Sequence, residues 1–336
     1  MLDARLTVLF AGSGEFGRPT LSALVDRHDV VRVHTQPDRP AGRGRKLTPT
    51  PIADFAIERG LELVRTDNLN TETLPPADVL VVIAFGQKIS DAVTRHPRLG
   101  AINLHASLLP KYRGAAPIHR ALINGERTVG NSVIRLARKM DAGAILGQSR
   151  LEVRPAETTG ELHDRLAEDG APLVLRVLDE LAAGTAVERE QDHAQATLAP
   201  KLSRADAVID FTRPAAEVAA KINGLSPWPG CHVRLLDADG RQLDRLTLLR
   251  ARVAEFDYPA ETMAHNGAEL ERVPPGRLGF PWPYGVAGRP AFVGAGDGSQ
   301  AVEILEVQPQ GKRPMPLPAY RNGKPWESGM RLEPEI

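Results

Sequence analysis

The sequence predicts an α/β protein with a doubly wound, mostly parallel sheet, followed by a small β barrel. In the first half, short apolar runs alternate with amphipathic helices, which is typical of a parallel sheet covered by helices. After the polar, irregular stretch 183–206 comes a short helix at Pro214–Asn223. Strand-like runs between turn residues then follow at 231–241, 246–256 and 291–308, and their shortness and spacing favour a barrel.

Strands in the first half are expected where short apolar runs lie between turn residues. These runs are Leu6–Ala11, Val30–His34, Leu61–Arg65, Asp78–Phe85, Gly100–Leu104, Asn131–Leu136 and Ile145–Val153. Helices are expected at Pro19–Arg27 and at Pro51–Gly60, which ends on glycine, a favourable C-terminal stop. A long helix begins at Thr158, pauses at Gly170 and continues to about Ala183.

Composition excludes several classes of protein. Lys plus Arg is 42 and Asp plus Glu is 42, so the zero net charge excludes a uniformly basic nucleic-acid coat but not a local basic patch. The single cysteine, Cys231, cannot form an internal disulfide, which indicates a reducing, intracellular setting. The longest apolar run, Val79–Gly86, is far shorter than the roughly 20 residues that span a bilayer, and the start lacks a signal-peptide profile. We expect a cytoplasmic protein without membrane contact.

The segment Gly12–Gly17 follows the first expected strand and fits the dinucleotide fingerprint G-x-G-x-x-G. A ribose-binding acid is expected at the end of the second strand, but that strand ends at Thr35 and Asp38 lies beyond it. The glycines are equally compatible with a tight strand-to-helix turn, so nucleotide binding and a purely structural turn both remain open.

Asn103 and His105 lie at the end of an expected strand. Residues two apart on a strand share a face, so these two side chains project together while Ile102 and Leu104 face the core. Ligands of open α/β sheets bind outside the carboxyl ends of the strands. An amide donor beside an imidazole suits acyl transfer, and two polar residues capping a strand are the alternative.

Asp141 is a third candidate, in the turn Met140–Gly143. It suits a carboxylate that holds a histidine in the required tautomer and takes up a proton. A residue that merely caps its own turn is the alternative.

The segment 36–47 is rich in Pro and Gly, and we expect it to lack regular structure. Its cations Arg39, Arg43, Arg45 and Lys46 are uninterrupted by any acid. They suit contacts with a phosphate backbone, although a solvated loop is the alternative. A second basic group near the C-terminus consists of Lys312, Arg313, Arg321 and Lys324.

Several chemistries lack their motifs. The sequence contains no G-x-S-x-G elbow and no Walker A loop, and none of its nine histidines has a metal-ligand spacing such as H-E-x-x-H. We expect Cys231 to be a small buried residue, and we expect no metal.

Taken together, these features resemble the methionyl-tRNA formyltransferase family. The segment Asn103–Ile118, NLHASLLPKYRGAAPI, is similar to the family signature almost without gaps. Its Asn-x-His and Ser-Leu-Leu-Pro elements are shared with the wider group of 10-formyltetrahydrofolate-dependent transferases. The basic segment 36–51 is similar to the segment that the narrower family inserts to grip tRNA. Leu225–Gly230 and Val307–Lys312 are also similar, and the resemblance covers about residues 5–325.

The resemblance implies a role for each matching residue. Asn103, His105 and Asp141 would be catalytic. The folate-binding residues would be Ser107, Leu108, Leu109, Pro110, Phe85 and Gly86, and the tRNA-binding residues Arg39, Arg43, Arg45, Lys46, Lys312 and Arg313. A formyltransferase domain would span 1–188, a linker 189–206 and an OB-like tRNA-binding barrel 207–325. The implied donor is 10-formyltetrahydrofolate and the acceptor is methionyl initiator tRNA, with neither NAD nor metal, and we expect a monomer.

The sequence departs from the family pattern in three places. Gly12-Ser13-Gly14 replaces the usual Gly-Thr-Pro, which accounts for the dinucleotide match. Ala144 replaces a second acid that often follows the position of Asp141, and residues 255–288 match poorly.

Three other functions compete with this one. A formyltransferase for an amino sugar nucleotide or another small amine shares the folate motifs but is disfavoured by the basic segment. A nicotinamide oxidoreductase depends on Gly12–Gly17 alone. A non-catalytic tRNA-binding module conflicts with a complete catalytic trio.

Overall fold

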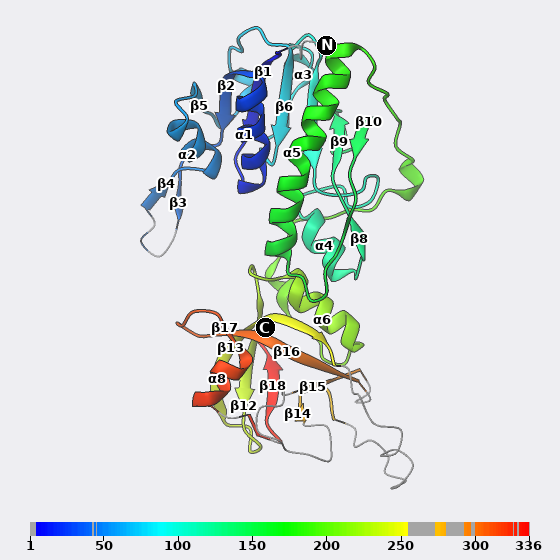
Figure 1. Ribbon diagram of the computed structural model, residues 1–336. Helices are drawn as coiled ribbons and strands as arrows, with labels where there is room; N and C mark the ends of the chain where they lie inside the picture. Colours follow the sequence, from blue (N-terminus) through cyan, green and yellow to red (C-terminus); the bar gives the residue numbers. More distant parts are fainter. Residues whose placement is uncertain are drawn as a thin grey trace. The chain divides into compact units, whose positions relative to one another are not determined.

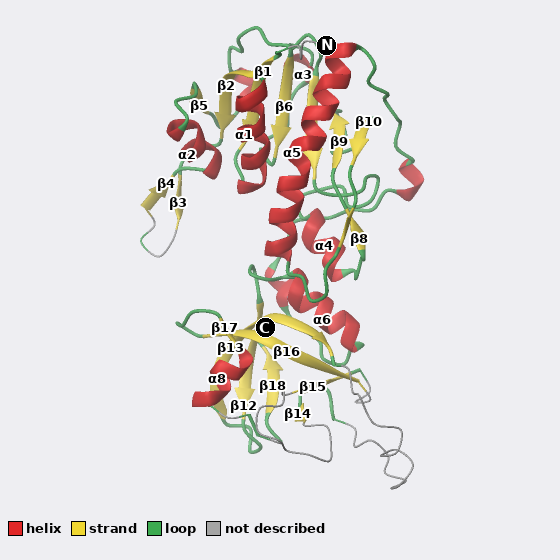
Figure 2. Cartoon of the chain, viewed as in Figure 1, coloured by secondary structure: helices red, strands yellow, loops and turns green. Residues whose placement is uncertain are grey.

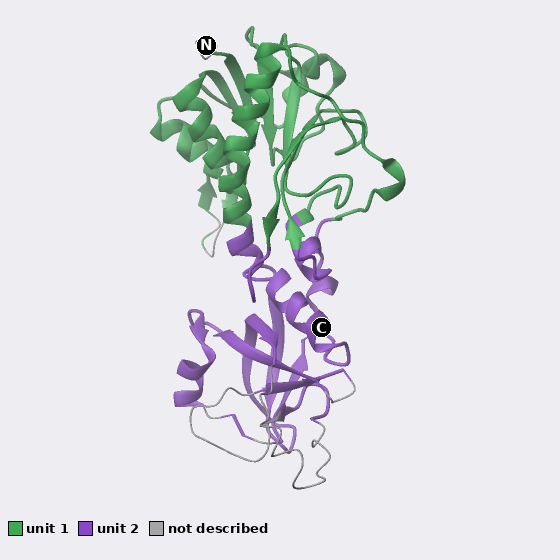
Figure 3. Ribbon diagram, turned by 45° about the vertical axis from the view of Figure 1, so that its right-hand side comes forward, with its two compact units in different colours: residues 1–117, 128–152, 163–200 green, residues 118–127, 153–162, 201–336 purple. Residues whose placement is uncertain are grey.

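The computed structural model describes residues 5–41, 44, 46–254, 273–279, 292–296, 300–324, 326–327 and 329–335 (Figure 1). The chain divides into two compact units (Figure 3). The first consists of residues 1–117, 128–152 and 163–200, and the second of residues 118–127, 153–162 and 201–336. Two short segments from the first half of the chain therefore belong to the unit that contains the C-terminal part.

A seven-stranded sheet forms the centre of the first unit. Its strands are β1 (Thr7–Gly12), β2 (Asp29–Thr35), β5 (Leu63–Arg65), β6 (Val79–Ile83), β7 (Ala101–His105), β9 (Ser132–Arg135) and β10 (Ile145–Gln148), in the order β10-β9-β7-β6-β1-β2-β5. The run from β5 to β7 is parallel, while β9 is antiparallel to both β7 and β10. This confirms the predicted mostly parallel sheet.

Helices and short strands complete this part of the chain. They are η1 (Glu15–Gly17), α1 (Arg18–Arg27), α2 (Pro51–Glu58), η2 (Leu69–Thr71), α3 (Asp91–Thr94), β8 (Thr128–Val129), β11 (Leu151–Glu152), α5 (Thr159–Ala183) and η3 (His193–Gln195). Figure 1 shows α1 and α5 lying across the same face of the sheet. The core beneath them is apolar, with Val8, Leu9 and Phe10 of β1 fully buried.

The expected pause at Gly170 is wrong, because α5 runs unbroken from Thr159 to Ala183. A Cβ atom at position 170 would lie 2.6 Å from Cδ2 of the buried Leu104. This glycine therefore allows the helix to approach β7 closely and does not interrupt it.

The expected irregular loop at residues 36–47 is also wrong in part. Strands β3 (Arg39–Ala41) and β4 (Lys46–Thr48) form a two-stranded antiparallel hairpin, in which Pro40 pairs with Leu47. A proline is tolerated in so short a ribbon because its missing N–H can face solvent at an edge.

The second unit contains an antiparallel sheet (Figure 2). Its strands are β12 (Cys231–Leu236), β13 (Gln242–Val253), β14 (Leu278–Gly279), β15 (Phe292–Ala295), β16 (Gln300–Pro309), β17 (Met315–Pro316) and β18 (Arg331–Pro334). Its helical segments are α4 (Pro117–Ile123), which begins at the last residue of the first unit, η4 (Arg204–Ala207), α6 (Ala215–Gly224) and α8 (Leu317–Gly323).

The sheet closes on itself into a barrel. The main path runs β14-β15-β16-β13-β12-β18, and a bridge between Arg277 and Arg331 joins its two ends. The Leu278 N–H donates to the Met330 carbonyl and the Leu332 N–H to the Gly276 carbonyl, each at 2.8 Å. The predicted small β barrel, of the OB-like type, is confirmed.

Cys231 begins β12 inside this barrel and is fully buried. Burial raises the pKa of its thiol to about 12, so the residue is an unreactive core side chain, as the sequence indicated. In the part of the chain that the structure describes, no helix is long and apolar enough to cross a bilayer.

Candidate active site

Asn103 and His105 lie at the carboxyl end of β7, where the neighbouring strands fix them. Asn103 is in register with Val82 of β6 and Ile134 of β9. His105 is 7% exposed and Asn103 is half-buried, while the intervening Leu104 is 3% exposed and faces the core. No other described residue hydrogen-bonds the Asn103 side-chain amide, so its donors are available to a ligand.

His105 is held by a hydrogen bond at one ring nitrogen and faces a carboxylate with the other. Its Nε2 lies 2.9 Å from the carbonyl oxygen of Tyr112, which can only accept, so Nε2 carries the proton of the neutral ring. Its Nδ1 faces Asp141 Oδ2 at 3.7 Å. That distance is too long for a hydrogen bond, so Nδ1 remains available to a substrate group beside it.

The Asp141 carboxylate reaches across the fold instead of capping its own turn. Its Oδ2 accepts a 2.8 Å hydrogen bond from the Gly114 N–H. The residue has a φ of 51°, a left-handed conformation that non-glycine residues rarely adopt. Two positions further on, a Cβ atom at Gly143 would collide with the carbonyl oxygen of Arg135, so only glycine fits there. The structure thus brings Asp141 to His105, although the two are far apart in the sequence.

Residues 107–110 form a turn directly after β7 that is supported from β9 and β10. The Ser132 hydroxyl donates to the Ser107 carbonyl at 2.6 Å and accepts from the Leu109 N–H at 3.1 Å. Gln148 Nε2 donates to the Leu109 carbonyl at 3.0 Å. Leu109 and Ser107 are buried, while Leu108 and Pro110 are partly exposed. Only these last two side chains of the predicted folate segment are therefore accessible to a ligand.

Phe85 and Gly86 follow β6 and are placed differently from each other. The Phe85 ring is 2% exposed and packs in the hydrophobic core, while its carbonyl accepts from Gln36 Nε2 at 2.7 Å. Gly86 is exposed with a φ of 76°, and a Cβ atom there would lie 2.6 Å from Gln36 Nε2. Any contact of this turn with a ligand thus involves its backbone and not the Phe85 ring.

Packing accounts for the first glycine of the dinucleotide-like segment. A Cβ atom at Gly12 would lie 2.7 Å from both the Ile83 carbonyl and the Phe10 ring. Asp38, the acid nearest to the end of β2, forms an ion pair with Arg65 at 2.8 Å.

The predicted tRNA-binding cations are only partly described. Arg39 and Lys46 are exposed, on opposite strands of the β3–β4 hairpin, whereas Arg43 and Arg45 lie outside the described residues. In the second unit, Lys312 and Arg313 are exposed in the turn between β16 and β17. Lys324 is paired with Asp244 at 2.7 Å, which removes it from the second basic group.

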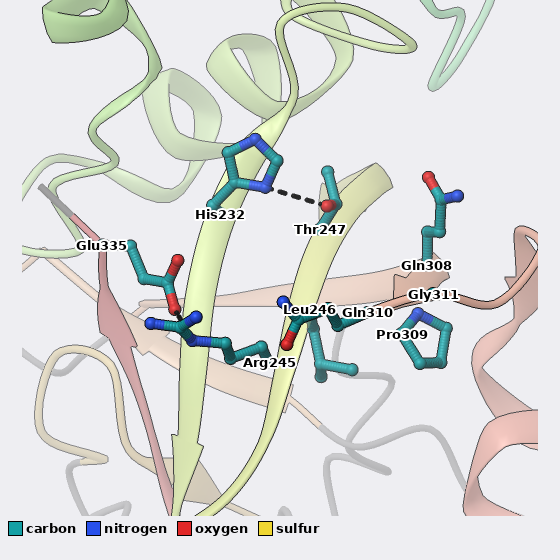
Figure 4. A pocket seen from close by; sticks show the side chains of 9 residues that line it. All are labelled: His232, Arg245, Leu246, Thr247, Gln308, Pro309, Gln310, Gly311 and Glu335. Carbon is teal, nitrogen blue, oxygen red and sulfur yellow. Dashed lines mark hydrogen bonds and ion pairs between the residues drawn. The ribbon is translucent and has the colours of Figure 1, made fainter. Parts of the chain in front are cut away.

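A pocket of about 280 Å³ opens beside this turn on the barrel (Figure 4). Within it, His232 Nδ1 lies 2.9 Å from the Thr247 hydroxyl, and Arg245 pairs with Glu335 at 2.8 Å. Gln308, which also lines the pocket, donates to the Lys312 carbonyl at 2.9 Å.

Among the residues whose positions are described, no cluster of His, Cys, Asp and Glu side chains could hold a metal ion.

Known proteins share this architecture. The model for the family described as "Formyl transferase" matches residues 4–178, and the model for "Formyl transferase, C-terminal domain" matches residues 201–325. WlaRD, a sugar 3N-formyl transferase studied in the presence of dTDP and 5-N-formyl-THF, superposes with a TM-score of 0.62 at 14% identity, over 92% of this chain and 100% of that one. Fold and site together define a formyltransferase.

Sequence relatives narrow this class. A methionyl-tRNA formyltransferase of Moorella thermoacetica is 39% identical over 96% of this chain and 98% of its own length. One of Chromohalobacter salexigens is 40% identical over 98% of each chain. The chain belongs to the methionyl-tRNA formyltransferase family.

Three functional elements of this site were missed from the sequence. They are the Tyr112 carbonyl, the Gly114 N–H and the side chain of Gln191, which bonds to the Asp141 turn. The first two are backbone groups, and a side-chain pattern gives no signal for them.

Proposed function

We propose that the protein transfers the formyl group of 10-formyltetrahydrofolate to the α-amine of methionyl initiator tRNA, acting as a cytoplasmic monomer. The observation that carries this proposal is the pair His105 Nδ1 and Asp141 Oδ2 at 3.7 Å, beside the available amide of Asn103 on the same strand. Membership of the methionyl-tRNA formyltransferase family supports the choice of acceptor.

In the proposed chemistry, the substrate amine attacks the formyl carbon and negative charge develops on the formyl oxygen. The Asn103 amide and a protonated His105 stabilise that oxyanion. Asp141 stabilises the imidazolium through its charge and helps to carry the proton lost by the amine toward the leaving nitrogen of the folate. The bond between the formyl carbon and that nitrogen then breaks, which gives the formylated amine and tetrahydrofolate.

We propose that the folate lies along Ser107–Pro110 and the backbone at Phe85–Gly86. These two turns follow β7 and β6, which are adjacent and parallel in the sheet, so both lie at its carboxyl edge. The partly exposed Leu108 and Pro110 offer apolar surface to a pteridine ring, and the exposed backbone at Gly86 permits close approach. In this proposal residues 1–188 form the catalytic domain and 189–206 the linker, of which residues up to 200 belong to the first unit.

We propose that tRNA is held by two separate basic regions. The first is the hairpin bearing Arg39 and Lys46, together with Arg43 and Arg45, which lie between these two residues in the sequence. The second is the barrel domain, residues 207–325, through Lys312 and Arg313. Exposed Arg and Lys side chains are among the groups that contact phosphate oxygens and position a nucleic acid.

The test is a formyl-transfer assay with methionine charged on initiator tRNA, methionine charged on elongator tRNA, and an amino sugar nucleotide, each with 10-formyltetrahydrofolate. We expect rapid transfer to the charged initiator tRNA, with the other two acceptors at least about 100-fold slower in kcat/KM. Faster transfer to the amino sugar nucleotide would overturn the proposal in favour of the small-amine alternative.

A further inference from the structure

Gln191 is a buried amide that the proposed mechanism does not use. It lies in the polar stretch after α5 and is 6% exposed. Its Nε2 donates two hydrogen bonds of 2.8 Å, one to the carbonyl of Asp141 and one to that of Gly143. Both N–H donors of this amide therefore bond to the turn that carries the candidate catalytic carboxylate.

The other end of Gln191 is tied to Arg113. Its Oε1 accepts from Arg113 Nε at 3.1 Å and Nη2 at 2.6 Å. The Arg113 side chain is 6% exposed, and Nη2 also lies 2.9 Å from His193 Nδ1. A planar guanidinium that presents two donors to one oxygen fixes the amide in a single orientation.

The residues on either side of Arg113 contact the candidate catalytic pair directly. The Tyr112 carbonyl accepts from His105, and the Gly114 N–H donates to Asp141. One continuous network therefore runs from His105 through residues 112–114 and Gln191 to the backbone of Asp141.

The stretch around Gln191 is itself anchored at both ends to the first unit. Arg189 forms a bridge with Ile145 of β10, with backbone hydrogen bonds of 2.7 and 2.9 Å. The Arg113 backbone bonds to Thr197 and Ala199 at 2.9 and 2.7 Å. The position of the Gln191 amide is thus determined by the fold and not by its own rotamer preference.

We infer that Gln191 is a positioning residue for Asp141, and that Arg113 acts through it. Asp141 is held at a φ of 51°, a strained conformation that persists only where its surroundings enforce it. Two donors on the carbonyls at positions 141 and 143 supply that constraint and set the distance of the carboxylate from His105. This inference rests on the proposed function, in which Asp141 is catalytic.

The sharpest test is Gln191→Glu, compared with Gln195→Glu as a matched control. Gln191→Glu keeps the shape and lets a carboxylate pair with Arg113, but it replaces the amide donor by an oxygen that faces two carbonyls. Gln195 lies in the same stretch, is exposed, and its side chain bonds to Asp192. In single-turnover formyl transfer, we expect Gln191→Glu to lower kcat about 10- to 100-fold with KM for both substrates within about twofold. The control should retain wild-type kcat.

A double-mutant cycle separates positioning from general destabilisation. If Gln191 acts through Asp141, Gln191→Glu should cost less than about threefold in an Asp141→Asn background, because the group that it positions is already lost. Arg113→Lys, which keeps the charge but loses the two-donor fork, is the second variant and should lower kcat about tenfold with the same non-additivity.

Two results would overturn the inference: a kcat within about twofold of wild type for Gln191→Glu, or an equal fold-loss in both backgrounds. The proposed function has a separate test. A fully active Asp141→Asn enzyme would refute the catalytic role of that carboxylate, independently of the result for Gln191→Glu. The thermal unfolding temperature of every variant should be measured to check that each protein is folded under the assay conditions.

Discussion

Asp141→Asn is the most informative single change to the candidate site. The substitution keeps the size of the side chain, and an amide oxygen can still accept the 2.8 Å hydrogen bond from Gly114. What it removes is the negative charge 3.7 Å from His105 Nδ1. The variant therefore isolates the electrostatic part of the proposed mechanism from the geometry of the turn.

The structure sets the size of the effect. Opposite unit charges 3.7 Å apart attract by about 4 kcal/mol at an effective dielectric of roughly 20. The His105 and Asp141 side chains are only 8% and 15% exposed, so solvent screens the pair weakly. Asp141 favours the protonated imidazole that stabilises the oxyanion, so removing its charge raises the free energy of the transition state. We expect turnover to fall about 10²- to 10³-fold.

The assay is single-turnover formyl transfer with enzyme in excess over charged initiator tRNA, so that product release does not mask the chemical step. Asp179→Asn is the matched control, because that carboxylate is 47% exposed and pairs with Arg27 on the surface. We expect the control to match wild type and KM for tRNA to be unchanged in both variants. A rate for Asp141→Asn within about threefold of wild type would refute the electrostatic reasoning.

Three further predictions concern Asn103, His34 and the turn that bears Lys312 and Arg313. Asn103→Ala should lower turnover about 10²-fold or more without weakening tRNA binding, and full activity would mean that the oxyanion is stabilised elsewhere. Burial lowers the pKa of His34 to about 4 in the folded protein, whereas the pKa of a histidine in the unfolded chain is about 6.5. As the pH falls between these two values, the unfolded chain binds a proton that the folded protein does not, so the folded state loses stability. We expect the free energy of unfolding, measured with denaturant, to fall by about 2 kcal/mol between about pH 7 and about pH 5. His34→Leu should abolish this fall, and a variant that shows the same fall as the wild type would contradict the prediction. Lys312→Ala and Arg313→Ala should each reduce by about one the slope of log tRNA affinity against log salt, with kcat at saturating tRNA preserved; an unaltered slope would exclude phosphate contacts there.

The sequence was most informative where an element is apolar and short. The run that forms β7 is bounded by Gly100 and by polar residues, so strand alternation alone was enough to place Asn103 and His105 on one face. The change from alternating helices and strands to short strands also located the barrel correctly.

Tertiary contacts decided the features that the sequence misjudged. Gly170 interrupts the helical pattern of the sequence, but its role is a close approach to Leu104, which local propensity does not encode. Strand β3 of the hairpin β3–β4 contains Pro40, a residue that argues against a strand when it is considered singly. Gln191 was not identified because its side chain bonds to backbone carbonyls. Every residue has a backbone carbonyl, so the sequence contains no motif that indicates which residues Gln191 contacts.

The zero net charge can now be related to individual ion pairs. Arg120 lowers the pKa of Asp206 to about 2 through a 2.6 Å contact, and Arg250 does the same for Glu161. Such pairs cancel inside a unit and contribute nothing to a distant phosphate.

Arg39, Lys46, Lys312 and Arg313 are different, because they are exposed and no described carboxylate neutralises them. Net charge is a sum over paired and unpaired groups, whereas a polyanion responds only to the unpaired ones. In the proposed function, these exposed cations would bind tRNA through few phosphates although the chain as a whole is neutral. Few contacts mean a shallow salt dependence and rapid release, which suits an enzyme that must discharge one tRNA in every turnover.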